Sequence, residues 1–188
     1  MAVRRPEGRD TMSSSGLLLI GDIPGFSPQI ARLVSMMNYA RYTTVSDVGG
    51  LGMEQLDYLN DPQSNSIGAL LLHIAAVEVW YSAATFAGRD LDAEELREWG
   101  AALDLGERAR REIRGNGLDY YLDRLRQVRA GTLAELGRRE DKWLEEQTPF
   151  WEGQHANNYF KWFHVLEDEL SHRGQIRWLR KRATGQGE

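Results

Sequence analysis

Hydrophobic residues recur along most of this chain at the three- and four-residue spacing that is typical of amphipathic helices. The spacing predicts four long helices, over residues 28–48, 65–86, 118–140 and 157–182. One or two short helices are expected between residues 90 and 115, and no segment shows the alternating pattern of a strand. The pattern therefore predicts an all-α fold, an antiparallel four-helix bundle with a short helical insertion between the second and third long helices.

Particular residues mark the expected helix ends and one irregularity. Ser27 before Pro28 is typical of a helix start. Asp104 is expected to cap a short helix, with Glu107 three positions on as in a capping box. Gly174 lies inside the last helix, where glycine costs about 1 kcal/mol relative to alanine. Close approach of a neighbouring helix is expected to compensate for this cost.

Length and composition narrow the class of protein. The 188 residues suit one domain over residues 17–188, preceded by a flexible tail over residues 1–16. A net charge of −5 argues against a nucleic-acid binder, which would normally show a basic stripe. The absence of cysteine excludes disulfides and a cysteine nucleophile and is compatible with the cytoplasm. The longest early apolar run, residues 17–20, is far shorter than the roughly 20 residues that a bilayer needs, so no membrane span is predicted.

The last helix carries His164, Asp168 and His172 at intervals of four residues, so the three side chains form one stripe. An i, i+4 pair of this kind can hold one divalent ion. All three residues do not fit one ion, because the two histidines are about 12 Å apart along a helix. Taken alone, the stripe is compatible with a polar network or with a metal site.

The other histidines are open to two interpretations. His73 is surrounded by apolar residues, and is either a hydrogen-bonded core histidine or a ligand or base inside the bundle. Glu78 points about 140° away from it on the same helix and is a poor co-ligand. His155 is expected on the surface or at the rim of a pocket. Three tryptophans are candidates for the wall of a pocket: Trp151, Trp162 and Trp178.

Two segments carry a family resemblance. The run SIGALLLHIAAVE, residues 66–78, resembles the second helix of the DinB-like superfamily, whose pattern is SIGxLLxHIxxxE. The run from His164 to Gln175, which ends in DELSHRGQ, resembles the last helix of that superfamily, which usually ends in HxxxHRGQ. The match extends loosely over residues 30–182, with both motifs in the expected order.

The resemblance implies a four-helix bundle that holds a divalent metal ion through three histidines, one from the second helix and two from the last. Carried over, the ligand positions are His73, Asp168 and His172, with aspartate where the family usually has histidine. An aspartate is a harder, anionic ligand, so the expected ion is zinc, nickel or manganese. The resemblance also places three residues beside the ligands or in the substrate pocket: His164, Glu167 and Gln175.

Members of this superfamily include thiol S-transferases that use bacillithiol or mycothiol, and a mycothiol-dependent isomerase. The resemblance therefore implies a metal-dependent enzyme that performs thiol S-transfer or hydrolysis on a low-molecular-weight thiol and a small-molecule substrate. The alternative is a stress-related, metal-binding bundle without turnover. An open metal position facing a cavity of several hundred Å³ would favour the enzyme. A homodimer is also expected, through Met36 and Tyr39 on the first helix.

Overall fold

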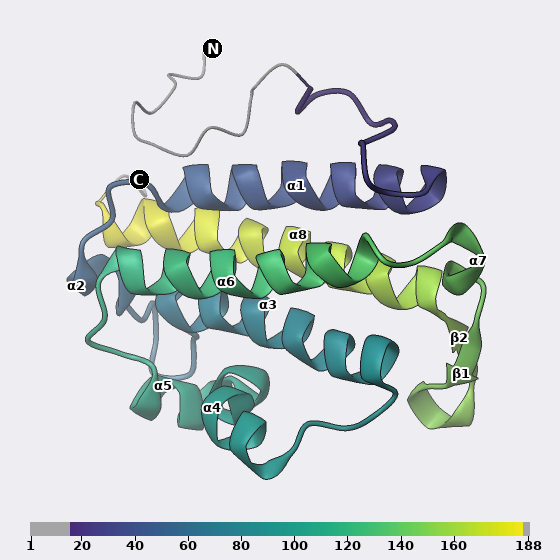
Figure 1. Ribbon diagram of the computed structural model, residues 1–188. Helices are drawn as coiled ribbons and strands as arrows, with labels where there is room; N and C mark the ends of the chain where they lie inside the picture. Colours follow the sequence, from purple (N-terminus) through teal and green to yellow (C-terminus); the bar gives the residue numbers. More distant parts are fainter. Residues whose placement is uncertain (1–15, 186–188) are drawn as a thin grey trace.

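The computed structural model describes residues 16–185, and four long helices dominate it (Figure 1). The long helices are α1 (Pro28–Val48), α3 (Ile67–Ser82), α6 (Leu118–Leu136) and α8 (Asn158–Ala183), and α3 continues into a π-helical turn, η1 (Ala83–Ala87). The short helices are α2 (Met53–Leu56), α4 (Ala93–Asp104), α5 (Gly106–Glu112) and α7 (Asp141–Leu144). Strands β1 (Gln147–Pro149) and β2 (His155–Asn157) enclose a 3₁₀ turn, η2 (Trp151–Gly153).

The predicted all-α fold is confirmed, and helices α4 and α5 form the expected insertion between the second and third long helices. The expectation that no strand exists was wrong for a short segment. Residues 147–149 pair antiparallel with residues 155–157. Three residue pairs are too few to produce a visible alternation in the sequence.

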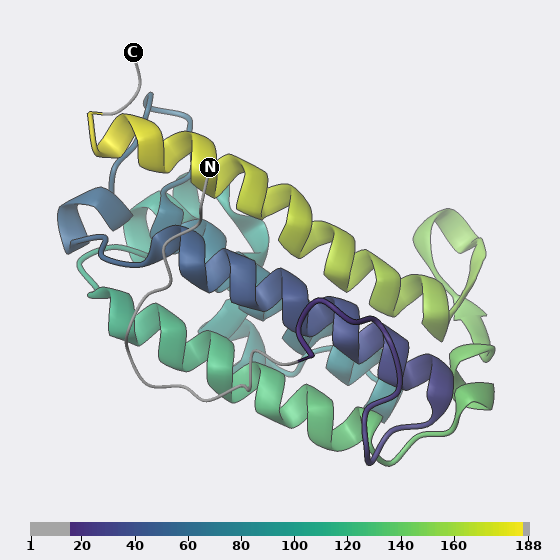
Figure 2. The ribbon, with the colours of Figure 1, turned by 90° about the horizontal axis from the view of Figure 1, so that it is seen from above.

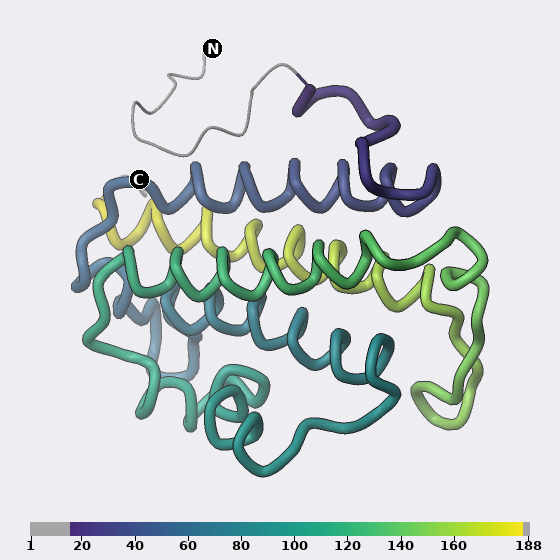
Figure 3. Tube along the Cα trace, viewed as in Figure 1, coloured from purple at the N-terminus to yellow at the C-terminus, as the bar shows by residue number. Residues whose placement is uncertain are grey.

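The four long helices form a ring in which α1 packs against α6 and α8, and α3 packs against the same two helices. Residue numbers increase in the same direction along α3 and α6. Tyr121 contacts Gly68 near the start of both helices, and Arg129 contacts Glu78 further along both. These two helices therefore run parallel, as do α1 and α8, whereas the α1/α6 and α3/α8 pairs run antiparallel (Figures 2 and 3). The α4–α5 insertion makes this arrangement possible, since it carries the chain back along the bundle before α6 begins.

Two of the expected helix-end contacts differ from the structure. Ser27 is the N-cap residue of α1, but its side chain makes no capping hydrogen bond. The Asp141 carboxylate accepts the hydrogen bond from the Gln29 amide instead, at 2.9 Å. Asp104 does not cap α5, because it belongs to the last turn of α4 and pairs with Arg108. A side chain from a distant segment supplies the α1 cap, and the local sequence contains no signal of it.

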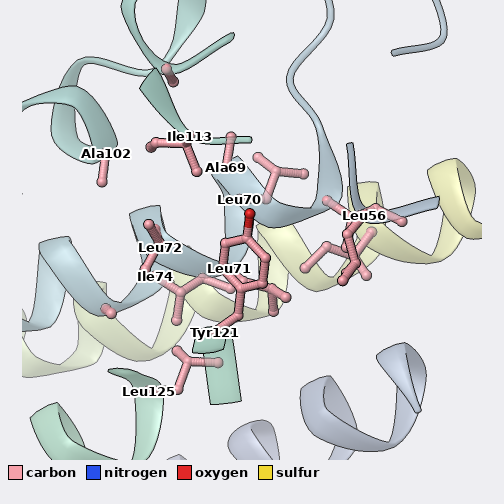
Figure 4. Packing of buried hydrophobic residues seen from close by; sticks show 14 of the residues in the cluster. Leu56, Ala69, Leu70, Leu71, Leu72, Ile74, Ala102, Ile113, Tyr121 and Leu125 are labelled. Atoms are coloured by element: carbon pink, nitrogen blue, oxygen red, sulfur yellow. The ribbon is translucent and has the colours of Figure 1, made fainter. Parts of the chain in front are cut away.

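The core consists of two hydrophobic clusters at opposite ends of the bundle. One contains residues of α3 up to Ala76 together with Tyr121, Leu125 and Ile176, and Figure 4 shows part of it. The other contains the first half of α1, the aromatic residues around Trp162, and the end of α6. On every long helix the two clusters are separated by one charged residue, which is buried on α3, α6 and α8 and partly buried on α1.

These four charged residues, here called the charge quartet, are Arg41, Glu78, Arg129 and Glu169. Arg129 donates to Glu78 Oε1 at 2.8 Å and to Glu169 Oε2 at 3.1 Å. Arg41 donates to Glu169 Oε1 at 2.8 Å and to Glu78 Oε2 at 3.1 Å. Each long helix thus contributes one member, and the quartet fixes the axial position of all four helices relative to one another.

Helix α3 with its π-helical extension, Ile67–Ala87, is long and apolar enough by composition to cross a membrane. In the structure 67% of its most apolar window is buried against the other helices. It also carries Glu78, whose side chain is fully buried and ion-paired. Its apolar composition is therefore accounted for by its central position in the bundle.

The expected flexible tail over residues 1–16 lies outside the described residues, apart from Gly16. Of the two residues expected at a dimer surface, Tyr39 is exposed, whereas Met36 packs partly against the core. The homodimer and the cytoplasmic location stay predictions.

Candidate metal centre

His73, Asp168 and His172 meet where the antiparallel helices α3 and α8 pack together, and they are here called the triad. The Nε2 atom of His73 lies 3.7 Å from Asp168 Oδ1, and that of His172 lies 3.4 Å from the same oxygen. The two imidazole rings are 4.7 Å apart and nearly perpendicular, at 80°. One ligand atom from each residue lies within 4.8 Å of the others, so the set could hold one metal ion.

Both imidazoles are held by their other nitrogen. His73 Nδ1 is 2.8 Å from the carbonyl oxygen of Ala102 on α4, and His172 Nδ1 is 3.1 Å from Oε1 of Gln175. Because these oxygens can only accept, each Nδ1 carries a proton, and each Nε2 faces Asp168, as a hydrogen-bond donor in the imidazolium and as a free lone pair in the neutral imidazole. Ligating histidines are usually oriented in this way, by a hydrogen bond from the nitrogen that does not bind the metal.

The carboxylate of Asp168 is anionic despite its surroundings. Burial alone would raise its pKa, but hydrogen bonds with His172 and His73 outweigh burial and hold the pKa well below its usual range. Burial alone would lower the pKa of His172, but the hydrogen bond and the charge of Asp168 outweigh burial, so the pKa is raised above its usual value. The second carboxylate oxygen, Asp168 Oδ2, is buried and has no hydrogen-bond partner among the described residues.

The triad fits a divalent ion. Two imidazole lone pairs and a carboxylate converge, and such a set requires a proton or a cation between its members. Nitrogen and carboxylate ligands suit zinc, nickel and manganese, and three protein ligands leave a position for water or substrate. The triad side chains are 13%, 16% and 14% exposed, so the group is neither sealed nor open on the surface.

The comparisons with known proteins bear on the fold and on the family. A conserved protein from Enterococcus faecalis of known structure superimposes with a TM-score of 0.60, at 15% identity, over 81% of this chain and 95% of that one. At this identity the likeness shows the fold alone. No curated protein matches the chain. The family model described as mycothiol-S-transferase matches residues 32–185. This chain belongs to the mycothiol S-transferase family.

Membership confirms the DinB-like resemblance, and the match covers every residue of the triad. Of the three residues expected beside the ligands, Gln175 contacts His172, and His164 lies one helical turn before Asp168. Glu167 is exposed and accepts a hydrogen bond from His164 at 3.0 Å, so it supports His164 and not the triad.

Two hollows flank the triad in this mycothiol S-transferase family member, although no triad residue lines either of them. A groove of about 540 Å³ is lined by residues of α3 and α8 that include Gln175 and Trp178. A second hollow of about 400 Å³ lies at the hairpin, with Trp151 and His155 in its wall. Two of the three tryptophans thus occupy pocket walls as expected, whereas Trp162 is fully buried in the core.

Gly174 also lines the larger groove, and a Cβ at this position would meet nothing within 4 Å. The expected close approach of a neighbouring helix was therefore wrong. Glycine here leaves the wall of the groove open.

Sequence reasoning missed the residues that surround the triad. Arg41 and Arg129 received no role, although Arg129 falls on the apolar face of α6 four residues after Leu125. A lone charge on a buried stripe was the available signal. Tyr81 is a further residue of this kind: the charge of Asp168 adds to burial in raising its pKa, so its hydroxyl stays protonated near the triad. The Ala102 carbonyl carries no sequence signal, because any residue supplies one.

Proposed function

We propose that the chain is a metal-dependent thiol S-transferase whose triad holds a zinc, nickel or manganese ion and whose thiol substrate is mycothiol. One observation supports this most: both Nε2 lone pairs converge on Asp168 Oδ1 while Ala102 and Gln175 hold the opposite nitrogens. The family assignment supports the choice of a thiol. When bound, the divalent ion would lower the pKa of a thiol and so supply thiolate at neutral pH.

The residues around the triad have distinct roles in this proposal. Ala102 and Gln175 hold the two imidazoles in the tautomer that leaves Nε2 free. Tyr81 keeps its phenolic proton and offers a hydrogen-bond donor on the side of Asp168. His164 is held by Glu167 at the adjacent turn and faces the hairpin. Partial burial of the triad limits the water that reaches it.

The proposed reaction is a transfer of sulfur to carbon. The thiol proton passes to solvent, a sulfur electron pair forms a C–S bond with the acceptor, and the leaving group departs with its bonding pair. The products are a thioether, a proton and the anion of the leaving group, so neither an oxidant nor a reductant is needed. The two hollows beside the triad favour this two-substrate reaction over hydrolysis, because a thiol and an acceptor each need a binding surface.

Metal binding is the first test. After chelation and reloading with zinc, nickel or manganese, elemental analysis of the parent is expected to give one ion per chain. His73→Ala and His172→Ala should lose it, and Asp168→Ala should bind it much more weakly. Asp168→His should retain it, since histidine is itself a ligand. Glu167→Ala is the matched control, because Glu167 neighbours Asp168 but faces solvent.

Retention of stoichiometric metal by both histidine variants would place the ion elsewhere. Transfer is then measured as loss of free mycothiol with iodoacetamide and chlorodinitrobenzene as acceptors, each of which carries a leaving group. The loaded parent should accelerate at least one reaction, and the metal-free protein and His172→Ala should not. A protein that binds one ion but accelerates none of them would favour the metal-binding bundle without turnover.

A further inference from the structure

The smaller hollow is built by the β1–β2 hairpin and the first turn of α8, at the end of the bundle where Figure 1 shows the hairpin. Its volume is about 400 Å³, which is within the range of small-molecule sites. Three of its lining residues are aromatic: Phe150, Trp151 and Phe160. The others are uncharged, apart from His155 when it is protonated. The hollow is therefore an aromatic surface with an amide-rich rim.

The three aromatic rings form a corner. Phe150 and Trp151 stack at 4.6 Å with their planes 28° apart, whereas Phe160 lies 6.3 Å from Trp151 at 90°. Trp151 is 52% exposed and Phe160 is 41% exposed. Large apolar side chains gathered in one exposed concave patch are typical of a binding site, because a ligand can cover them.

The hairpin is built to hold this corner in place. Lys161 is buried beneath it, where its ammonium group contacts the Thr148 hydroxyl and lies 5.4 Å from the centre of the Phe150 ring. No carboxylate pairs with Lys161 among residues 16–185, so the ring is its main electrostatic partner. Glu152 has a φ of 53°, which is uncommon for a residue other than glycine and turns the chain directly after Trp151.

The corner approaches the triad through two residues, Tyr81 and His164. The Tyr81 ring lies 6.1 Å from Phe150 and 5.9 Å from His164, and Tyr81 also lies in the field of Asp168. His164 meets the Trp151 ring edge-on at 4.9 Å. Since His164 precedes Asp168 by one helical turn, about 5.4 Å along the axis, the hollow lies next to the triad along α8, with Tyr81 and His164 between them.

We propose that the aromatic hollow is the acceptor subsite and that it selects planar, uncharged, electron-poor aromatic electrophiles that carry a leaving group. The faces of indole and phenyl rings are electron-rich, so they favour stacking with an electron-poor ring. Amide groups at the rim, from Gln147, Gln154 and Asn157, suit nitro or carbonyl oxygens. The inference rests on the proposed S-transfer: sulfur bonds to the ring carbon, and the leaving group departs with its electron pair.

The binding test needs no turnover. Dinitrobenzene is planar and electron-poor and has no leaving group, so it reports occupancy of the hollow by calorimetric titration of the metal-loaded protein. Trp151→Ala is expected to raise its Kd roughly tenfold, the loss expected for one aromatic stack. Phe160→Leu should raise it less. Lys161→Met should also weaken binding, because the support beneath Phe150 is lost.

Trp178→Ala is the matched control, since Trp178 is a similarly exposed tryptophan, at 45%, but lines the other groove. Its Kd for dinitrobenzene should equal that of the parent within twofold. Equal binding by Trp151→Ala and the parent, or equal weakening by Trp178→Ala, would overturn the assignment.

Kinetics provide a second readout. Trp151→Ala should lower kcat/KM for chlorodinitrobenzene roughly tenfold and leave kcat/KM for iodoacetamide, which has no ring, unchanged. If neither electrophile reacts in the parent while dinitrobenzene binding still depends on Trp151, the proposed S-transfer fails and the aromatic subsite stands. If transfer occurs but Trp151→Ala changes neither the binding of dinitrobenzene nor the selectivity between the two electrophiles, only the subsite assignment fails.

Discussion

Asp168 and Glu169 are consecutive carboxylates on α8, but they face two different polar regions of the bundle. Glu169 is almost fully buried, and both of its oxygens accept hydrogen bonds from Arg41 and Arg129. Asp168 is partly exposed, shares one oxygen with two imidazoles, and leaves the other without a partner in the part of the chain that the structure describes. The charge quartet is thus complete within the chain, whereas the triad gains a positive charge only by protonation of a histidine or by binding a cation.

This difference separates a structural polar cluster from a functional one. In the quartet two guanidinium groups face two carboxylates, and the carbonyls of Met37 and Leu125 accept the remaining donors. In the triad, one anion and two lone pairs converge, and hydrogen bonds hold the imidazoles in that orientation. Burial alone does not distinguish the two regions, but the balance of donors and acceptors does.

The largest expected effect comes from breaking the quartet. Arg129→Met leaves Glu78 and Glu169 facing each other in the core with only Arg41 to pair them. An uncompensated buried charge costs about 3–5 kcal/mol, so the free energy of unfolding should fall by that amount in urea denaturation. Variant protein that remains folded should still bind one metal ion per chain, because the triad contains no quartet member.

Arg126→Met is the control for this substitution. Arg126 lies on the same helix, is exposed and pairs with Asp123. Its replacement should change the free energy of unfolding by no more than about 0.5 kcal/mol. Loss of metal from folded Arg129→Met would mean that the two regions are coupled and that the comparison is wrong.

The sequence predicted the triad far better than it predicted the quartet, and the reason is geometric. Asp168 and His172 lie one turn apart within one motif, and the resemblance supplied His73. The quartet takes one residue from each of four helices, and no local spacing connects them. Only their position on apolar faces marks them, and their partners depend on how the helices are aligned in the bundle.

The same contrast applies to the fold. The ends of α1 and the start of α8 were predicted to within one residue, because helical periodicity and end signals are local. The parallel direction of α3 and α6 depends on the path of the α4–α5 insertion. The aromatic corner depends on the hairpin, which places Phe150 and Trp151 against Phe160. Neither arrangement follows from periodicity.

The second prediction uses pH to show that the quartet is charged. Burial would raise the pKa of Glu78, but Arg129 and Arg41 outweigh it and lower the pKa below the ordinary value of 4.5. The folded pKa is thus below the unfolded one, so the stabilisation is complete above the unfolded pKa and is lost as pH falls through the folded pKa. Glutamine resembles a protonated glutamate in shape and charge.

The stability difference between the parent and Glu78→Gln should therefore be large at neutral pH and should shrink on acidification. Urea denaturation of both metal-free proteins across the acid range measures it. A difference that is constant with pH would mean that Glu78 contributes through packing and not through its charge.

The smallest expected effect sharpens the description of the triad. Gln175 holds His172 by accepting the Nδ1 proton, and it is exposed. Gln175→Leu removes that acceptor, so metal affinity should fall by about tenfold, as is typical when the group orienting a ligating histidine is lost. Gln175→Glu should retain or strengthen binding, because a carboxylate accepts the same proton more strongly. Both metal-free variants should match the parent stability to within about 0.5 kcal/mol, since the residue faces solvent. Competition with a chelator of known affinity measures the Kd. Equal affinities for the leucine, glutamate and parent proteins would show that His172 needs no such support, and that Asp168 and the packing of α8 alone orient its ring.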